Sequence, residues 1–174
     1  MITYKSFKAR QASDIIFYPC LLKEYRNRWF ILGITKISNE ITTFALDRIQ
    51  QIVPLPNEPF RQPKNFDPHT YFNNIIGVTR NTTDKPTHIT FLTDHSQAPY
   101  IKTKPIHSSQ QVIEERKDGI IFRIDVIPNF ELERELIGFG EGLKILSPDS
   151  LIRRFRKRAK LMYEIYHGTT STLP

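Results

Sequence analysis

The chain has 174 residues, a single cysteine and a formal net charge of +7, with 39% hydrophobic and 25% charged residues. This composition is typical of a globular protein with one domain or two small ones, and it excludes a disordered or collagen-like chain. No apolar run is long enough to span a bilayer, no signal peptide opens the chain, and one cysteine excludes an intrachain disulfide. We therefore expect a cytoplasmic protein with no membrane contact, whose positive charge favours an anionic partner.

The positive charge lies at the two ends of the chain. Residues 1–55 carry +4, residues 56–148 carry −1 and residues 149–174 carry +4. Charge that clusters on one element is typical of nucleic-acid binding proteins, but a solvated helix face gives the same pattern. Both interpretations stay open for the C-terminal cluster.

Residues 1–55 are predicted to form a small β-barrel of the Sm or SH3 type, because short strands follow one another with no helix between them. Residues 28–35 carry the strongest strand signal. Pro19 interrupts the strand at 14–22, which predicts an edge position or a bulge. A turn is expected at 38–40, with positive φ at its asparagine. The remaining strands are expected at residues 2–8, 41–46 and 49–55.

Residues 56–85 are predicted to be a proline-rich linker. Five of the twelve prolines of the chain fall between residues 54 and 68, a density that favours an extended and stiff segment. Asp67 and Pro68 fit the N-cap and first position of a short helix that runs to about Phe72.

Residues 86–167 are predicted to form a ferredoxin-like domain, because strand and helix signals follow in the order β-α-β-β-α-β-α. Strands are expected at 88–93, 110–116, 119–127 and 143–146, and helices at 96–102, 130–137 and 149–166. Asp118 and Gly119 are the predicted hairpin turn, and Asn129 is the predicted cap of the second helix. Ser147 is expected to cap the last helix, with Pro148 at its first position. The fold class is therefore α+β, and residues 168–174 are expected to be a disordered tail.

No catalytic residues, metal ligands or cofactor site are predicted. The histidines and Cys20 are scattered, whereas a zinc site needs several such ligands at tight spacing, and Cys20 lies within a predicted strand. The glycines of 138–142 follow a helix instead of opening one, so they indicate a helix end and not a phosphate loop. Glu131, Glu133 and Glu135 complement the dipole at the start of a helix. We therefore expect a protein that is not an enzyme.

Basic and aromatic residues are interleaved in the predicted barrel, a combination with which small barrels bind single-stranded nucleic acid. Trp29 and Phe30 are adjacent in one strand and point to opposite faces, so we expect at least one of them in the core. Arg28 and Arg48 have two open interpretations, an ion pair with Asp47 on the rim or guanidinium groups directed at an anion. The set comprises Tyr18, Lys23, Tyr25, Arg26, Arg28, Trp29, Phe30 and Arg48.

Residues 17–53 resemble the WYL domain, a bacterial module named after a Trp-Tyr-Leu motif. The matching stretches are Tyr18 to Leu22, Arg28-Trp29-Phe30-Ile31 with Gly33, and Leu46-Asp47-Arg48-Ile49. Phe30 stands at the motif's tyrosine and Ile31 at its leucine, so a ligand contact made by that tyrosine hydroxyl is absent here.

Residues 86–167 resemble the WCX extension that commonly follows a WYL domain. The matching stretches are Gly119 to Pro128, Leu136-Ile137-Gly138-Phe139-Gly140, and Leu146-Ser147-Pro148 followed by the long helix.

The resemblance implies a transcription regulator in which the WYL domain is an Sm-like barrel that senses a ligand. It implies a single-stranded nucleic acid or nucleotide effector, a homodimer, and a helix-turn-helix domain as the element that reads DNA. No such domain precedes the predicted barrel, so we expect either part of a longer regulator or a free-standing sensor. The ligand-binding residues carried over are Arg28, Trp29, Phe30 and Arg48, with Lys23 and Tyr18 from the same face.

A dimerisation or scaffold module without a ligand is the alternative function. Its basis is the helix predicted at 149–166, whose apolar stripe suits a partner chain as well as its own domain. Arg154, Lys157 and Arg158 on this helix are candidates for contact with a nucleic-acid backbone, with a solvated face as the other interpretation.

Overall fold

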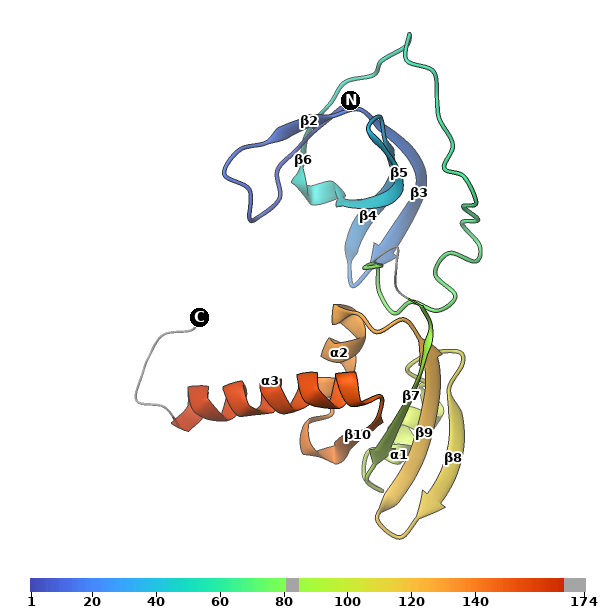
Figure 1. Ribbon diagram of the computed structural model, residues 1–174, viewed down its shortest axis with the longest axis vertical. Coiled ribbons are helices and arrows are strands. Elements are labelled where there is room, and N and C mark those ends of the chain that lie inside the picture. The colour runs from blue at the N-terminus through green and yellow to red at the C-terminus, as the bar shows by residue number, and fades with distance from the viewer. Residues whose placement is uncertain (81–84, 168–174) are drawn as a thin grey trace. The chain divides into compact units, whose positions relative to one another are not determined.

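The computed structural model describes residues 1–80 and 85–167, which fall into two units, Met1–Thr82 and Thr83–Pro174 (Figure 1). The expected tail at 168–174 lies outside the described residues. Taken together, the two units contain α-helices and antiparallel sheets, which confirms the α+β class.

The first unit contains two three-stranded antiparallel sheets. One sheet has the order β2-β1-β6 and the other the order β3-β4-β5. Within the described residues these ladders do not close into one hydrogen-bonded barrel. A short 3₁₀ helix, η1 (Leu46–Arg48), joins the two sheets. The strands are β1 (Ile2–Tyr4), β2 (Ser13–Ile15), β3 (Phe17–Tyr25), β4 (Arg28–Thr35), β5 (Ser38–Ala45) and β6 (Ile49–Ile52).

The two sheets share one apolar core. Ile2, Phe17 and Phe44 are buried together, and strands of both sheets contribute side chains to the cluster. The ring of Phe44 packs edge-on against Phe17, with 5.1 Å between centroids, and lies 4.6 Å from the ring of Tyr4. Aromatic contacts at these distances add to the burial of apolar area, so Phe44 ties β5 to the opposite sheet.

β4 confirms the strongest strand prediction, residue for residue, and Pro19 lies on edge strand β3 at a bulge, as predicted. The bulge brings β3 very close to β4 at Gly33. A Cβ atom built at Gly33 would lie 2.1 Å from the carbonyl oxygen of Tyr18 and 2.7 Å from the ring of Phe17. Only glycine therefore fits this position of the motif.

The predicted turn at 38–40 is wrong. Ser38 pairs with Thr35, so the turn is formed by residues 36–37 and Asn39 lies inside β5. The sequence did not indicate a strand at this position, because Ser38, Asn39 and Glu40 together are typical of a turn.

The predicted helix after Asp67 is also wrong. The Asp67 carboxylate does accept hydrogen bonds from the His69 N–H and the Thr70 hydroxyl, as a cap would. Separate turns then follow, with bonds from Asn73 N–H to the Thr70 carbonyl and from Ile75 N–H to the Phe72 carbonyl. These bonds span three residues, so they close single turns and do not continue an α-helical ladder.

The second unit has the predicted order of strands and helices. Its sheet has the order β10-β7-β9-β8 with all neighbours antiparallel. Phe91 pairs with Phe122 in the centre, and their rings stack 5.7 Å apart. The elements are β7 (Thr87–Thr93), α1 (Ala98–Thr103), β8 (Gln111–Arg116), β9 (Gly119–Val126), α2 (Phe130–Ile137), η2 (Gly140–Gly142), β10 (Leu143–Ser147) and α3 (Asp149–His167).

Two element ends in this unit differ by one residue from the prediction. The side chain of Asn129 accepts from the Leu132 N–H at 2.8 Å, which confirms it as the cap of α2. The β8–β9 turn is formed by residues 117–118, because Gly119 already pairs with Arg116. Ser147 ends β10, and its hydroxyl lies 2.8 Å from that of Thr90, so it does not cap α3.

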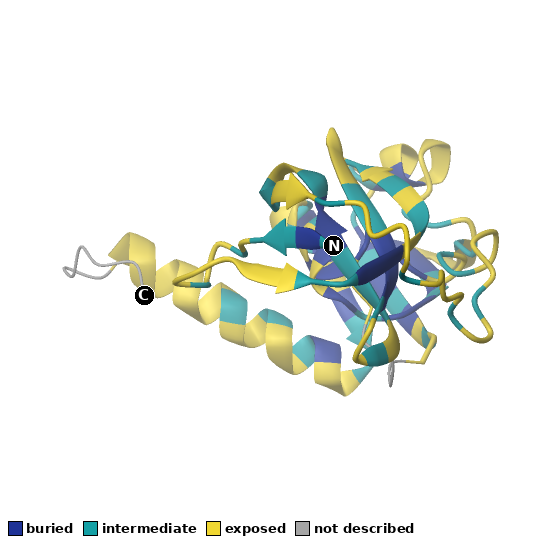
Figure 2. Ribbon diagram, turned by 90° about the horizontal axis from the view of Figure 1, so that it is seen from above, coloured by how far each residue is buried: buried dark blue, intermediate teal, exposed yellow. Residues whose placement is uncertain are grey.

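α3 is covered only over its first turns. Leu151 is its one buried residue, and every described residue from 159 to 167 is exposed (Figure 2). The exposed residues there include the large apolar side chains Leu161, Met162, Tyr163, Ile165 and Tyr166. The apolar spacing that predicts the helix is therefore correct, but the second half of its stripe covers no core in this unit.

We expect Gly33→Ala to destabilise the first unit by about 3 kcal/mol, because the added methyl group collides with the backbone of β3. Urea unfolding followed by the fluorescence of Trp29, the single tryptophan, measures this change. Ile37→Ala is the control, since Ile37 lies in the same unit and is 98% exposed in a turn. A loss at Gly33 no larger than that at Ile37 would contradict the assignment.

Candidate functional site

The proline-rich segment, residues 56–80, is part of the first unit and contacts two of the predicted ligand residues, Tyr18 and Lys23. Tyr18 is 3% exposed, and its hydroxyl donates to Glu58 at 2.6 Å. This hydrogen bond raises the pKa of Tyr18 above its ordinary value. The ammonium group of Lys23 lies 5.0 Å from the ring centre of Phe72. Both side chains therefore face the proline-rich segment.

Glu58 fastens this segment to the sheet. Its second carboxylate oxygen accepts from the Lys36 ammonium group at 2.8 Å, and the Arg61 guanidinium lies 5.5 Å from the Tyr18 ring. Hydrogen bonds from Lys36 and then from Tyr18 lower the pKa of Glu58. The sequence reading of this stretch as a linker missed these contacts, because each joins residues far apart in the chain.

Trp29 and Phe30 do not lie in the core, contrary to expectation. Trp29 is 52% exposed and Phe30 is partly buried, because the buried part of β4 begins only at Leu32. Register places Phe30 opposite Lys23 and Trp29 opposite Glu24, so the two rings project from opposite faces of the sheet.

Arg28 forms the ion pair with Asp47 that was one of the two interpretations left open by the sequence. Its Nε lies 3.2 Å from a carboxylate oxygen of Asp47, and both side chains are exposed. An exposed pair of this kind contributes about 0–1 kcal/mol to stability, so it is readily exchanged for another anion.

Arg48 has a different environment from Arg28. Its guanidinium carbon lies 3.9 Å from the ring centre of Phe7, within cation–π range. Its Nε is buried and has no hydrogen-bond partner among the described residues. A buried donor without a partner is costly, so this environment sets Arg48 apart from the exposed Arg28.

A pocket of about 270 Å³ lies beside Arg48. The loop after β1 forms one wall, and η1 with the start of β6 forms the other, where the Lys5 N–H donates to the Arg48 carbonyl at 3.2 Å. The sequence analysis did not predict three of the pocket residues, Lys5, Phe7 and Gln50. The only signal in the sequence was that the basic Lys5 lies two positions before the aromatic Phe7. The lining residues are Lys5, Ser6, Phe7, Asp47, Arg48 and Gln50.

Two of the three basic residues predicted on the last helix have a structural partner. Glu133 of α2 is nearly buried, and its two oxygens lie 2.9 Å from Arg154 Nε and 2.9 Å from Arg158 Nη2. A buried carboxylate requires such pairing, so these arginines dock α3 on α2. Lys157 is exposed on the same helix.

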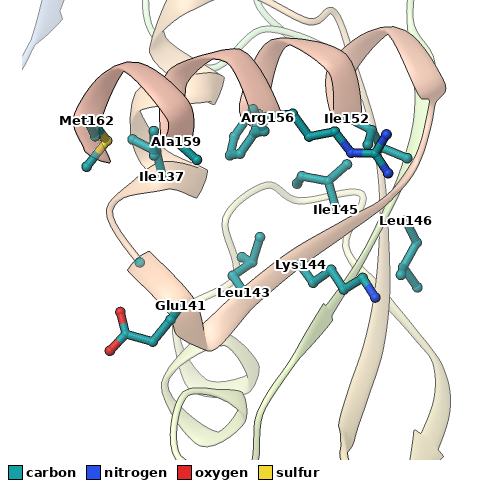
Figure 3. A pocket seen from close by; sticks show the side chains of 12 residues that line it. Ile137, Glu141, Leu143, Lys144, Ile145, Leu146, Ile152, Arg156, Ala159 and Met162 are labelled. Carbon is teal, nitrogen blue, oxygen red and sulfur yellow. The ribbon is translucent and has the colours of Figure 1, made fainter. Parts of the chain in front are cut away.

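An apolar groove of about 660 Å³ follows α3 and β10 (Figure 3). Leu143 and Ile145 lie on its floor, and Ile152, Ala159 and Met162 of α3 lie along its upper side. Lys144 and Arg156 project at one end and Glu141 at the other. The groove is thus continuous with the exposed apolar half of α3.

No group of three or more histidine, cysteine, aspartate or glutamate side chains in residues 1–80 and 85–167 is placed to hold a metal ion. None of the helices described combines the length and the apolar character needed to cross a bilayer.

Family models match both units. The WYL domain model matches residues 1–54 and the WCX domain model matches residues 85–163. A search among curated proteins finds no match.

Two solved structures are similar to the chain. The proteasome accessory factor B/C (PafBC) of Arthrobacter aurescens is 16% identical, with a TM-score of 0.43 over 99% of this chain and 26% of that chain. A CRISPR Cas-related protein is 12% identical, with a TM-score of 0.56 over 95% of this chain and 46% of that chain. The chain spans less than half the length of either, and the second likeness shows a shared fold.

We expect the stability of the first unit to depend on Glu58 through pH. Because the folded-state pKa lies below the ordinary value of 4.5, Glu58 stabilises the fold above that pH, and this contribution is lost as pH falls through the lowered value. Glu58→Gln should therefore lose less stability than the wild type between about pH 5 and pH 3. Urea unfolding followed by Trp29 fluorescence measures the difference. Glu40→Gln, in β5, is the control. If the wild type and Glu58→Gln lost the same stability on acidification, the role of Glu58 in holding the segment would be contradicted.

Proposed function

The chain belongs to the family of proteins that join a WYL domain to a WCX domain, and on this premise we propose that it is the regulatory part of a transcription regulator and senses an anionic effector. The effector is a single-stranded nucleic acid or a nucleotide, bound in the pocket beside Arg48. Its binding is passed to a DNA-binding domain, and no chemical reaction is involved.

Arg48 carries this proposal. It lines the pocket, and its guanidinium group lies over the ring of Phe7, 3.9 Å from the ring centre. A guanidinium group in this position donates charge-assisted hydrogen bonds to a phosphate or carboxylate that enters the pocket. The nearby Lys5 adds a second positive charge to the lining of the same pocket.

Arg28 supports Arg48 by pairing with Asp47. Asp47 lines the pocket and is neutralised by Arg28 at 3.2 Å. The charges around the pocket therefore sum to a positive value, as an anion requires. Tyr18 and Lys23 do not join this group, because their contacts are with Glu58 and Phe72.

We also propose the finer fold assignments. The shared core of the two sheets in the first unit suits an Sm-like barrel whose strands are held together by side chains where the ladder is broken. The strand order β10-β7-β9-β8, all antiparallel, suits a ferredoxin-like sheet followed by one more helix.

We expect Arg48→Ala to weaken binding of a labelled single-stranded oligonucleotide at least about tenfold, because a charge-assisted hydrogen bond is lost. The magnitude of the slope of log affinity against log salt should also fall by about one, the value expected for the loss of one phosphate contact. Fluorescence anisotropy at several salt concentrations measures both effects, and a mononucleotide competitor distinguishes the two effector classes. Arg134→Ala removes the same charge from the exposed face of α2 and should leave affinity unchanged. Unchanged affinity in a folded Arg48→Ala variant would contradict the site.

Dimerisation is the second candidate function, and the exposed half of α3 favours it. Five large apolar side chains there are exposed, and one of them, Met162, also lines the apolar groove along β10. A second copy has the same helix and the same groove, so a two-fold interface buries both.

We expect Ile165→Glu to shift the chain toward monomer, because the carboxylate would be buried at the interface. Ile165 is about half exposed in the isolated unit, so the fold should be unaffected. Sedimentation velocity over a concentration series measures the shift. Ile37→Glu is the matched control, since Ile37 is 98% exposed in a turn of the first unit. A wild-type chain that stays monomeric at all concentrations would contradict this second function.

A further inference from the structure

Phe7 presents an aromatic ring to solvent in the pocket beside Arg48. The side chain is 76% exposed although it belongs to the pocket lining. The Arg48 guanidinium lies 3.9 Å from the ring centre and covers one face. This contact fixes the ring in place, while most of the ring surface stays open.

We propose that Phe7 is a stacking platform for a nucleobase and that it makes the pocket select nucleotides over other anions. The inference rests on the proposed function and names the ligand chemistry of the same site. Every base has a π-face, so an open aromatic ring binds bases without needing a particular sequence. The flat guanidinium behind the ring extends the same stacked arrangement.

The charges of the pocket do not distinguish one anion from another. Lys5 and Arg48 attract a phosphate, and the Asp47 carboxylate in the same lining is paired with Arg28 at 3.2 Å. Any anion gains from this net positive charge, and a ligand that also covers the ring of Phe7 gains more.

The size and polar groups of the pocket fit one nucleotide unit. A volume of about 270 Å³ lies just below the usual range for small-molecule sites, so the pocket suits a ligand no larger than one base with its phosphate. Gln50 is exposed in the lining and offers an amide with both donors and an acceptor, which suits the edge of a base.

The test compares two single-stranded probes with the same number of phosphates, an oligothymidylate and an abasic oligomer of equal length. We expect the wild-type chain to bind the thymidine probe at least about fivefold more tightly. Phe7→Leu should bind both probes with the affinity that the wild type has for the abasic one. Phe7→Trp should keep the preference, because the indole ring also stacks.

Phe60→Leu is the matched control, since Phe60 is an exposed aromatic residue of the same unit that lines a different pocket. It should leave the preference unchanged. Equal wild-type affinity for the two probes, or a preference that survives in Phe7→Leu, would overturn the platform while the anion site stands. Absence of binding to either probe would overturn the proposed function itself.

Discussion

The packing of Phe44 between the rings of Phe17 and Tyr4 is the contact on which the first unit depends. It joins two sheets that share no continuous ladder within the described residues. Phe44 is followed at once by Ala45 and by η1, so the same contact sets where Arg48 emerges. The backbone bond from Lys5 to Arg48 then holds the loop after β1 against η1. The pocket beside Arg48 thus exists because an apolar cluster fixes both of its walls.

The sequence was informative wherever one segment decides its own structure. β4 and α2 follow from strand propensity and from a capped helix, and Pro19 marks the bulge that makes Gly33 necessary. The turn before β5 was misplaced because local turn propensity at 38–40 competes with pairing to β4, and pairing prevails. Strand pairing is a contact between segments, so propensity alone does not decide it.

The candidate site was harder to predict for the same reason. Arg28 and Arg48 were singled out, but Phe7 lies forty-one positions before Arg48 and has no pattern of its own. The proline-rich segment reads as a spacer from composition, yet Glu58 reaches Tyr18 across forty positions and seals one face of the sheet. Only the folded chain shows which basic and aromatic residues share a pocket and which are already occupied by a partner.

The local environment of each basic residue, and not its position in the chain, therefore decides whether its positive charge is already paired. Arg154 and Arg158 belong to a buried carboxylate, and their charge serves the docking of α3. Arg28 is shared with Asp47 at the surface, where exchange for a ligand costs little. Arg48 lies over the ring of Phe7, which neutralises none of its charge, and it lines the pocket. Among these four arginines, Arg48 is therefore the one that we propose as the anion-binding residue.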